Sequence, residues 1–389
     1  MTFDMMTSFT TVLLLMAIGE IVSKKTGAKV PSVFVTAVLF LIGYWTIFPK
    51  DIVDKSVLGM PLAQIAMYIL AVHMGTLFNF SELKTQWKTI LISLGGVLGI
   101  IVSLLTIGRF FLEREFLIVS APPLTGGLVA AIIMSETALA KGFESLSVLA
   151  IILYVMQGFV GYPITAIVLR KECQRLLKDY RNGNGTLVQV EATTRKKKLI
   201  NFPESFNSIP FYLCKMGIVV ILAIYSEKLS NGIMSKYVFC LIYGTIGAEL
   251  GFLEDKILNK CESFGLFMVS LMIFIFSSLS KATPDLLLLI LQPLIIVLFL
   301  ATSGLIIVAI LVGKYLGYSK EMSIAIAITA FYGFPANFVL SEEASEANGE
   351  SKDEIAFLKQ EIVPKMIVAG FTSVTIVSIV VAGILSKML

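Results

Sequence analysis

Long apolar stretches separated by short polar loops dominate this chain. Twelve such segments lie near 9–23, 31–48, 61–79, 89–111, 115–140, 147–169, 209–227, 237–253, 263–281, 286–313, 321–341 and 363–386. Most hold about 17–25 residues, the length that an α-helix needs to cross the hydrocarbon of a bilayer. The pattern predicts an all-α polytopic membrane protein.

One long polar stretch, residues 170–208, interrupts the series. It contains many lysines and arginines, including the run Arg195–Lys198, and the flexible sequence NGNG. Because cytoplasmic loops carry an excess of Lys and Arg, we expect this basic linker to be cytoplasmic. It divides the chain into an N-terminal membrane repeat (1–169) and a C-terminal membrane repeat (209–389).

The two halves share an interrupted apolar segment. Residues 121–142 read APPLTGGLVAAIIMSETALAKG, and residues 327–348 read AITAFYGFPANFVLSEEASEAN. A shift of 206 positions pairs Gly127 with Gly333, Ser135 with Ser341 and Glu136 with Glu342. Weaker matches follow in order along the halves. A shift of 212 pairs Gly158 with Gly370, and we assign the six extra residues to a longer acidic loop at 341–361.

Glycine and proline interrupt both segments. Pro122 and Pro123 precede Gly126 and Gly127 in the first, which leaves a helix of only about 20 Å from residue 128 to residue 140. Non-helical backbone at membrane depth occurs where it is buried in protein or lines a wet cavity. Interrupted segments at matching positions of two halves are typical of a transporter's binding site. The alternative is a pair of ordinary kinked helices.

The side on which each loop lies depends on whether these segments cross the membrane. Six full crossings per half would make the repeats parallel, whereas a segment that returns to its own side would make them inverted. The second arrangement places more lysines and arginines inside, which is the usual bias. We therefore predict two inverted repeats, each with five transmembrane helices plus one re-entrant hairpin or broken helix. Both termini would lie outside the cell (plasma or inner) membrane.

The breaks predict a binding site for a carboxylate and a small cation. A helix that begins at a break carries partial positive charge and free N–H groups, which suit an anionic or zwitterionic substrate. The expected substrate-binding residues are Thr125, Gly126, Gly127, Tyr332, Gly333, Pro335, Thr372 and Thr375. Freed carbonyls, hydroxyls and amides suit sodium, and the expected ion-binding residues are Ser135, Glu136, Thr329, Asn337 and Ser341.

Glu136 and Glu342 admit two interpretations. A buried carboxylate inside a membrane binds a cation or carries a proton in many proteins. Each of these residues, however, lies nine positions after its aligned glycine, about 13 Å along a helix. That distance favours a place at the membrane–water interface over a role as ion ligand.

Composition narrows the function classes. Hydrophobic residues make up 57% of the chain and charged residues only 15%, which leaves no large soluble domain and no basic surface for nucleic acid. The chain contains one histidine and four scattered cysteines, and lacks H-E-x-x-H and G-x-S-x-G motifs. We therefore expect no enzymatic activity and no cofactor other than sodium as a coupling ion.

Several runs resemble the bacterial sodium/glutamate symporters. They are KVPSVFVTAVLFLIG (29–43), HMGTLFNFSELK (73–84), PLTGGLVAA (123–131) and QGFVGYPITAIVLRK (157–171), with Val363 and Pro364 opening a similar last helix. The resemblance implies two re-entrant hairpins that meet at mid-membrane and usually a homodimer. The chain has Leu128 and Val129 where the family has His and Gly, and Thr372 and Thr375 where it has Asp and Asn. Glutamate as the substrate therefore stays open.

These observations predict a secondary active transporter. It would couple sodium to the movement of a small organic anion or amino acid by alternating access, within the lipid bilayer. The alternative is a cation/proton antiporter that uses a mid-membrane carboxylate such as Glu136. A passive channel is a further alternative, which accumulation against a gradient would exclude.

Overall fold

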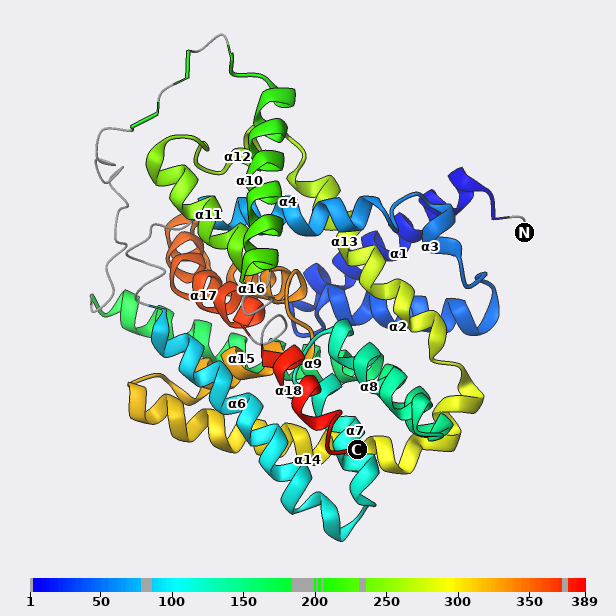
Figure 1. Ribbon diagram of the computed structural model, residues 1–389. Coiled ribbons are helices and arrows are strands. Elements are labelled where there is room, and N and C mark those ends of the chain that lie inside the picture. The colour runs from blue at the N-terminus through cyan, green and yellow to red at the C-terminus, as the bar shows by residue number, and fades with distance from the viewer. Residues whose placement is uncertain are drawn as a thin grey trace. The chain divides into compact units, whose positions relative to one another are not determined.

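A computed structural model describes residues 3–77, 86–183, 199–200, 202–203, 206–230, 236–372 and 377–389 (Figure 1). Within these ranges all regular structure is helical, and none of the described residues lies in a β-strand. The helices of the first half are α1 (Met5–Thr26), α2 (Ser32–Thr46), α3 (Ile52–Lys55), α4 (Leu62–Thr76), α6 (Trp87–Thr106), α7 (Arg114–Leu124), α8 (Leu128–Ala140) and α9 (Glu144–Arg181). Those of the second half are α10 (Ile209–Leu229), α11 (Lys236–Leu250), α12 (Ile257–Lys260), α13 (Phe264–Ser277), α14 (Pro284–Leu316), α15 (Lys320–Ile328), α16 (Ala336–Asn348), α17 (Lys352–Thr372) and α18 (Ser378–Leu385). Short 3₁₀ turns complete the fold at η1 (Gly108–Phe110), η3 (Ser278–Lys281) and η4 (Thr329–Phe331).

Six of the described helices are long and apolar enough to cross a membrane. They cover Met5–Thr26, Trp87–Phe110, Glu144–Arg181, Ile209–Leu229, Phe264–Lys281 and Ile290–Leu316. Large apolar side chains point outward from them: Leu98 of α6 is 59% exposed and Phe299 of α14 is 70% exposed. Extended apolar surface of this kind suits lipid better than water. The chain therefore has the character of a multi-pass membrane protein.

The chain forms two compact units, and each unit draws on both halves of the sequence. The first consists of Met1–Thr10, Asp51–Trp87 and Leu187–Ser277, and the second of Thr11–Lys50, Lys88–Thr186 and Ser278–Leu389. The boundary between repeats that the sequence predicts at 170–208 is thus different from the boundary between compact units. The linker itself begins later than expected, because α9 continues as a helix to Arg181.

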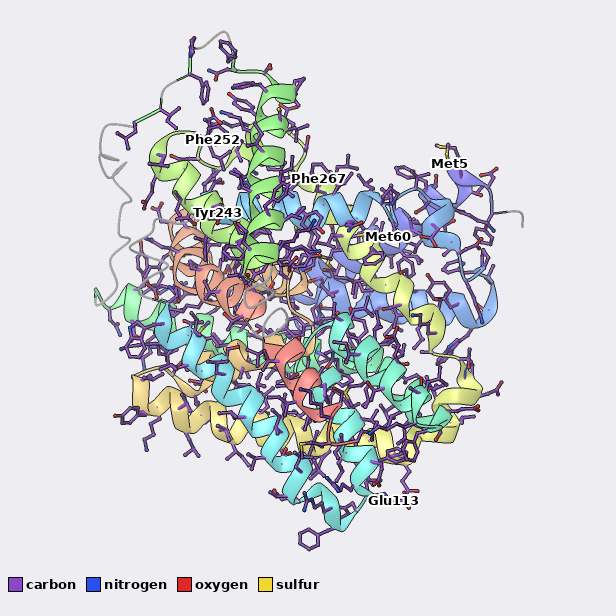
Figure 2. The ribbon with its side chains drawn as sticks, viewed as in Figure 1. Met5, Met60, Glu113, Tyr243, Phe252 and Phe267 are labelled. Carbon is purple, nitrogen blue, oxygen red and sulfur yellow. The ribbon has the colours of Figure 1, made fainter. Side chains whose placement is uncertain are left out.

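The first unit contains α4, α10, α11 and α13. Aromatic side chains are common in it, among them Tyr243, Phe252 and Phe267, which are labelled in Figure 2. α4 and α11 approach closely where Gly75 and Gly244 face each other, since a Cβ on either glycine would overlap the backbone of the opposite helix. Small residues permit this close approach of helices in membranes.

The second unit contains both interrupted segments. The segment at 115–140 forms two helices, α7 and α8, and the segment at 321–341 forms α15 and α16, so both breaks are confirmed as interruptions of helix. α8 and α16 each have 13 residues. Each is followed by three non-helical residues and then by a long helix, α9 or α17. α16 begins 208 positions after α8, at residues 336 and 128, and α17 begins 208 positions after α9, at residues 352 and 144.

The acidic loop expected at 341–361 is helical instead. α16 extends to Asn348, and α17 begins at Lys352 and ends at Thr372. The charges that suggested a loop pair across the two helices: the Lys359 ammonium contacts the carboxylates of Glu342 and Glu346 at 2.5 and 2.8 Å. These cross-helix ion pairs stabilise an arrangement that charge composition alone does not reveal.

α6 and α14 pack against each other in an antiparallel sense. Lys88, at the start of α6, donates to the carbonyl oxygen of Leu316 at the end of α14, with an Nζ–O distance of 3.1 Å. At the middle of the pair, a Cβ on Gly99 would overlap the Gly304 carbonyl, and a Cβ on Gly304 would overlap the Gly99 carbonyl. The two glycines are 205 positions apart, the same offset that separates α3 at residue 52 from α12 at residue 257.

Candidate functional site

The first break lies between α7 and α8. Gly126 and Gly127 have φ angles of 110° and 98°, which L-residues with a Cβ rarely adopt, so glycine is required here. Thr125 is fully buried, and its hydroxyl donates to the Pro122 carbonyl at 2.8 Å. α7 tolerates Pro122 and Pro123 because they occupy its last turn, after which the helix stops.

The second break lies between η4 and α16. Gly333 has a φ angle of 63°, and its amide donates to the Thr329 carbonyl at 2.7 Å. The buried Thr329 hydroxyl donates to the carbonyl of Ile326, also at 2.7 Å. Pro335 directly precedes the first residue of α16. The expected residues Thr329, Gly333 and Pro335 therefore shape the break itself.

Asn337 joins the second break to α17. Its side-chain amide is fully buried and donates to the Met366 carbonyl, and its Oδ1 accepts from the Phe338 amide at 2.8 Å. A Cβ on Gly370 would overlap the Asn337 amide, so the close approach requires glycine at this position of α17. Phe334 stacks on Phe371 with ring centroids 5.1 Å apart. These contacts fix the break against α17 and occupy both polar ends of the Asn337 amide.

Tyr332 joins the second break to α9. Its hydroxyl lies 2.6 Å from the Thr165 hydroxyl, and its ring lies 5.2 Å from the Tyr162 ring between centroids. A Cβ on Gly161 would stand only 2.8 Å from Cδ1 of Tyr332. The second break is therefore held between two helices, α9 on one side and α17 on the other.

α9 is the helix that the two breaks have in common. It contacts α7 and α8 on either side of the first break, and α15, η4 and α16 on either side of the second. Its N-terminal half also pairs with α8 through the hydroxyls of Ser135 and Ser147, 2.8 Å apart. Thr125 makes a local hydrogen bond only to its own helix turn, whereas Tyr332 reaches α9.

The remaining expected residues occupy other surroundings. Glu136 is exposed on α8, and Glu342 pairs with Lys359 away from the break. Ser341 is buried and donates to the Asn337 carbonyl at 2.6 Å. Thr372, at the end of α17, donates to the Val368 carbonyl at 2.8 Å, and Thr375 lies outside the described residues. The binding roles of these residues stay predictions.

A cavity of about 610 Å³ opens along α16 beyond the break. Its lining includes Glu20, Lys24 and Ser32 from the first half, together with Phe338 and Glu343 of α16. The Glu343 carboxylate accepts from the Ser32 amide at 3.2 Å. Burial raises the pKa of this carboxyl above its usual value, although the Ser32 hydrogen bonds oppose the effect. Phe338 follows Asn337 directly, so the cavity reaches the first turn of α16.

Sequence reasoning missed the polar face of α9. Gln157, Gly161 and Thr165 follow one another at intervals of four residues, which places them on one side of the helix. The side-chain oxygen of Gln157 is buried and has no hydrogen-bond partner. The i, i+4, i+8 spacing within an apolar helix is the signal that could have identified this face.

The described residues contain no group of three or more His, Cys, Asp or Glu side chains placed to hold a metal ion. Comparison with protein-family models found no matching family, and comparison with curated proteins found no matching relative.

Proposed function

We propose that this chain is a secondary active transporter that couples sodium to the symport of a small organic anion or amino acid by alternating access. One observation carries the proposal: two apolar helices are broken at equivalent positions of the two halves, and both breaks adjoin α9. Discontinuous membrane helices at corresponding positions of two repeats are the usual place of a transporter's substrate and ion sites.

The chemistry of the breaks suits an anionic group. α8 and α16 each begin at a break and run for 13 residues, so each directs the partial positive charge of its N-terminus toward its break. In α16 the Asn337 and Phe338 amides already donate to Gly333 and to Asn337 Oδ1, so the N-terminus of α8 is the one that would offer N–H groups to a ligand. A carboxylate of the substrate would accept hydrogen bonds from such an N-terminus without a positively charged side chain. Both zwitterionic amino acids and organic acids carry this group.

The direction of α6 and α14 supports the inverted topology. A two-fold axis places a residue beside its own equivalent, as Gly99 lies beside Gly304. If the axis ran along the membrane normal, equivalent helices would be parallel, whereas an axis in the membrane plane makes them antiparallel. The Lys88–Leu316 hydrogen bond supports the second case. An even number of crossings between α6 and α14 then follows, and a re-entrant hairpin at the first break would supply it by leaving four of the five intervening segments as crossings.

Two parts that move against each other are needed for alternating access, and the division of the chain into two compact units supports such a mechanism.

The positions of the carboxylates favour symport over cation/proton antiport. Glu136 is exposed and Glu342 is ion-paired, so neither adjoins a break as a free acid.

The test is uptake by the purified full-length chain in proteoliposomes with an inward sodium gradient. Labelled glutamate, aspartate and di- and tricarboxylates are the substrates, and we expect accumulation of at least one of them that a sodium ionophore abolishes. Uptake that only equilibrates, or that needs no sodium, would contradict the proposal.

Matched glycine variants connect this uptake to the breaks. Gly333→Ala forces a Cβ into the left-handed conformation at the second break, and Gly142→Ala imposes the same strain in an open loop where no atom lies within 4 Å. Each substitution costs about 1–2 kcal/mol of backbone strain. We expect uptake to be lost in Gly333→Ala and retained in Gly142→Ala.

A further inference from the structure

We infer that Gln157 binds the transported cation with its side-chain carbonyl oxygen. This inference rests on the proposed function and adds a ligand that neither repeat motif contains. The ligand of this oxygen would be either sodium itself or the ammonium of an amino acid, since both are small cationic groups that need an oxygen ligand.

The first observation is an unsatisfied polar atom. Gln157 is 1% exposed, and its Oε1 atom accepts no hydrogen bond. A buried amide oxygen without a partner destabilises the folded state, so proteins rarely retain one without a use for it. A cation at this position would satisfy the oxygen.

The second observation is the position of Gln157 on α9, one helical turn from the glycine that meets the second break. Gln157 lies one helical turn before Gly161, on the side of α9 that faces Tyr332. The Tyr332 hydroxyl contacts the Thr165 hydroxyl. Nearer the start of α9, a Cβ added to Gly161 would stand 2.8 Å from Cδ1 of Tyr332 and 3.2 Å from Cβ of Phe331. The ring therefore runs from Gly161 toward Thr165, and the backbone of the break lies at the end nearer Gln157.

The third observation is the chemistry of that backbone. The residues of η4 and of the turn after it depart from the α-helix, so their carbonyl oxygens are released from the regular i→i−4 hydrogen-bond pattern. Carbonyl, amide and hydroxyl oxygens are the ligands that small hard cations prefer. The side-chain amides also differ in state: Asn337 has both polar ends occupied by protein groups, whereas the oxygen of Gln157 is available.

The experiment measures the melting temperature of the purified full-length chain in sodium chloride and in choline chloride at equal ionic strength. A ligand that binds the folded state raises its apparent stability. We expect sodium to stabilise the wild type, and Gln157→Leu to require at least tenfold more sodium for the same shift, as the loss of a hydrogen-bond-strength contact to a charge predicts. Gln157→Glu keeps an oxygen at this position and should retain or strengthen the sodium response.

The outcomes separate the inference from the proposed function. If wild type shows no sodium response, with or without the carboxylate panel, both fail. If wild type and Gln157→Leu respond equally to sodium and equally to the amino acids, the inference is overturned and the proposed function stands. A sodium response that Gln157→Glu abolishes would identify an anion partner and would also overturn the inference. If Gln157→Leu alters only the response to amino acids and not to sodium, the cationic group is the substrate ammonium.

Discussion

At the scale of single residues, a buried charge pair stands out. Lys215 lies in the second turn of α10 and is 1% exposed. Its ammonium contacts both carboxylate oxygens of Glu254 at 2.6 and 2.7 Å and lies 4.9 Å from the Phe202 ring centroid. A carboxylate and aromatic faces together replace the water that the ammonium loses on burial.

Removing one member of this pair should therefore lower the stability of the folded chain. Glu254→Ala leaves the Lys215 ammonium buried without its partner, and we expect a loss of about 3–5 kcal/mol of stability. The double variant Lys215→Met/Glu254→Gln removes both charges and should recover most of that loss. Thermal unfolding of the purified chain measures both, and equal destabilisation of the single and double variants would contradict the interpretation.

A second charge pair makes stability depend on pH. Arg181, at the end of α9, contacts Glu354 near the start of α17 with an Nε–Oε1 distance of 2.7 Å. Hydrogen bonds from the Arg181 guanidinium hold the pKa of Glu354 at about 2, below its usual value of 4.5. The folded state therefore gains stability from ionised Glu354 above pH 4.5, and this gain disappears as pH falls from 4.5 through about 2.

Glu354→Gln tests this dependence, because it removes the charge and keeps the shape. We expect the melting temperature of the variant to lie below that of wild type by a constant amount from pH 5 to pH 8, and the difference to shrink below about pH 4.5. Glu144→Gln, at an exposed position at the start of α9, serves as the control with little effect. A difference that persists unchanged at pH 3 would contradict the role of the pair.

At the scale of elements, glycines determine how closely the helices approach. The crossing of α6 and α14 depends on Gly99 and Gly304, each of which faces the carbonyl of the other. Gly304 also faces the Ser103 side chain, so no space for a methyl group exists on its side of the contact. Close backbone packing supplies the van der Waals contact that holds helices together in lipid, where apolar burial contributes little.

Gly304→Ala should separate α6 from α14. The added methyl overlaps backbone atoms, which cannot rotate away, and we expect a loss of about 1–3 kcal/mol of stability. Gly383→Ala is the matched control: it lies in α18, no atom lies within 4 Å of its added Cβ, and alanine favours helix by about 1 kcal/mol. Thermal unfolding in detergent measures both variants, and we expect a lower melting temperature for Gly304→Ala only.

At the scale of the whole molecule, the side of the membrane on which each loop lies distinguishes inverted repeats from parallel repeats. If α7 and α8 form a re-entrant hairpin, residues before α7 and after α8 lie on the same side. If they form one kinked crossing, the same residues lie on opposite sides. The exposed residues Glu113 and Glu144 mark the two ends, and Glu113 is labelled in Figure 2.

Cysteine labelling at these two positions distinguishes the topologies. In a chain whose native cysteines Cys173, Cys214, Cys240 and Cys261 are replaced, Glu113→Cys and Glu144→Cys should both react with a membrane-impermeant maleimide from outside intact cells. The basic linker provides the opposite control, since Gly183→Cys should react only after the membrane is opened. Labelling of only one of the first two positions would rule out the hairpin.

The helices and their breaks could be predicted from the sequence. Apolar length determines where a membrane helix can form, and proline and positive-φ glycine act on their own backbone, so Leu128–Ala140 was predicted with the boundaries that α8 has. The same local reasoning failed at 341–361, where acidic residues suggested a loop. Those residues are helical because Lys359 on the next helix neutralises two of them.

The partners of each polar side chain were decided only by the tertiary structure. Asn337 donates to Met366, Tyr332 reaches Thr165, and Gln157 has no protein partner for its oxygen. These facts depend on which helices pack against which, and on the side of each helix that faces inward, whereas the sequence determines only the spacing along one helix. The sequence therefore located the breaks, and the packing of α9 and α17 around the second break decided which side chains stand beside it.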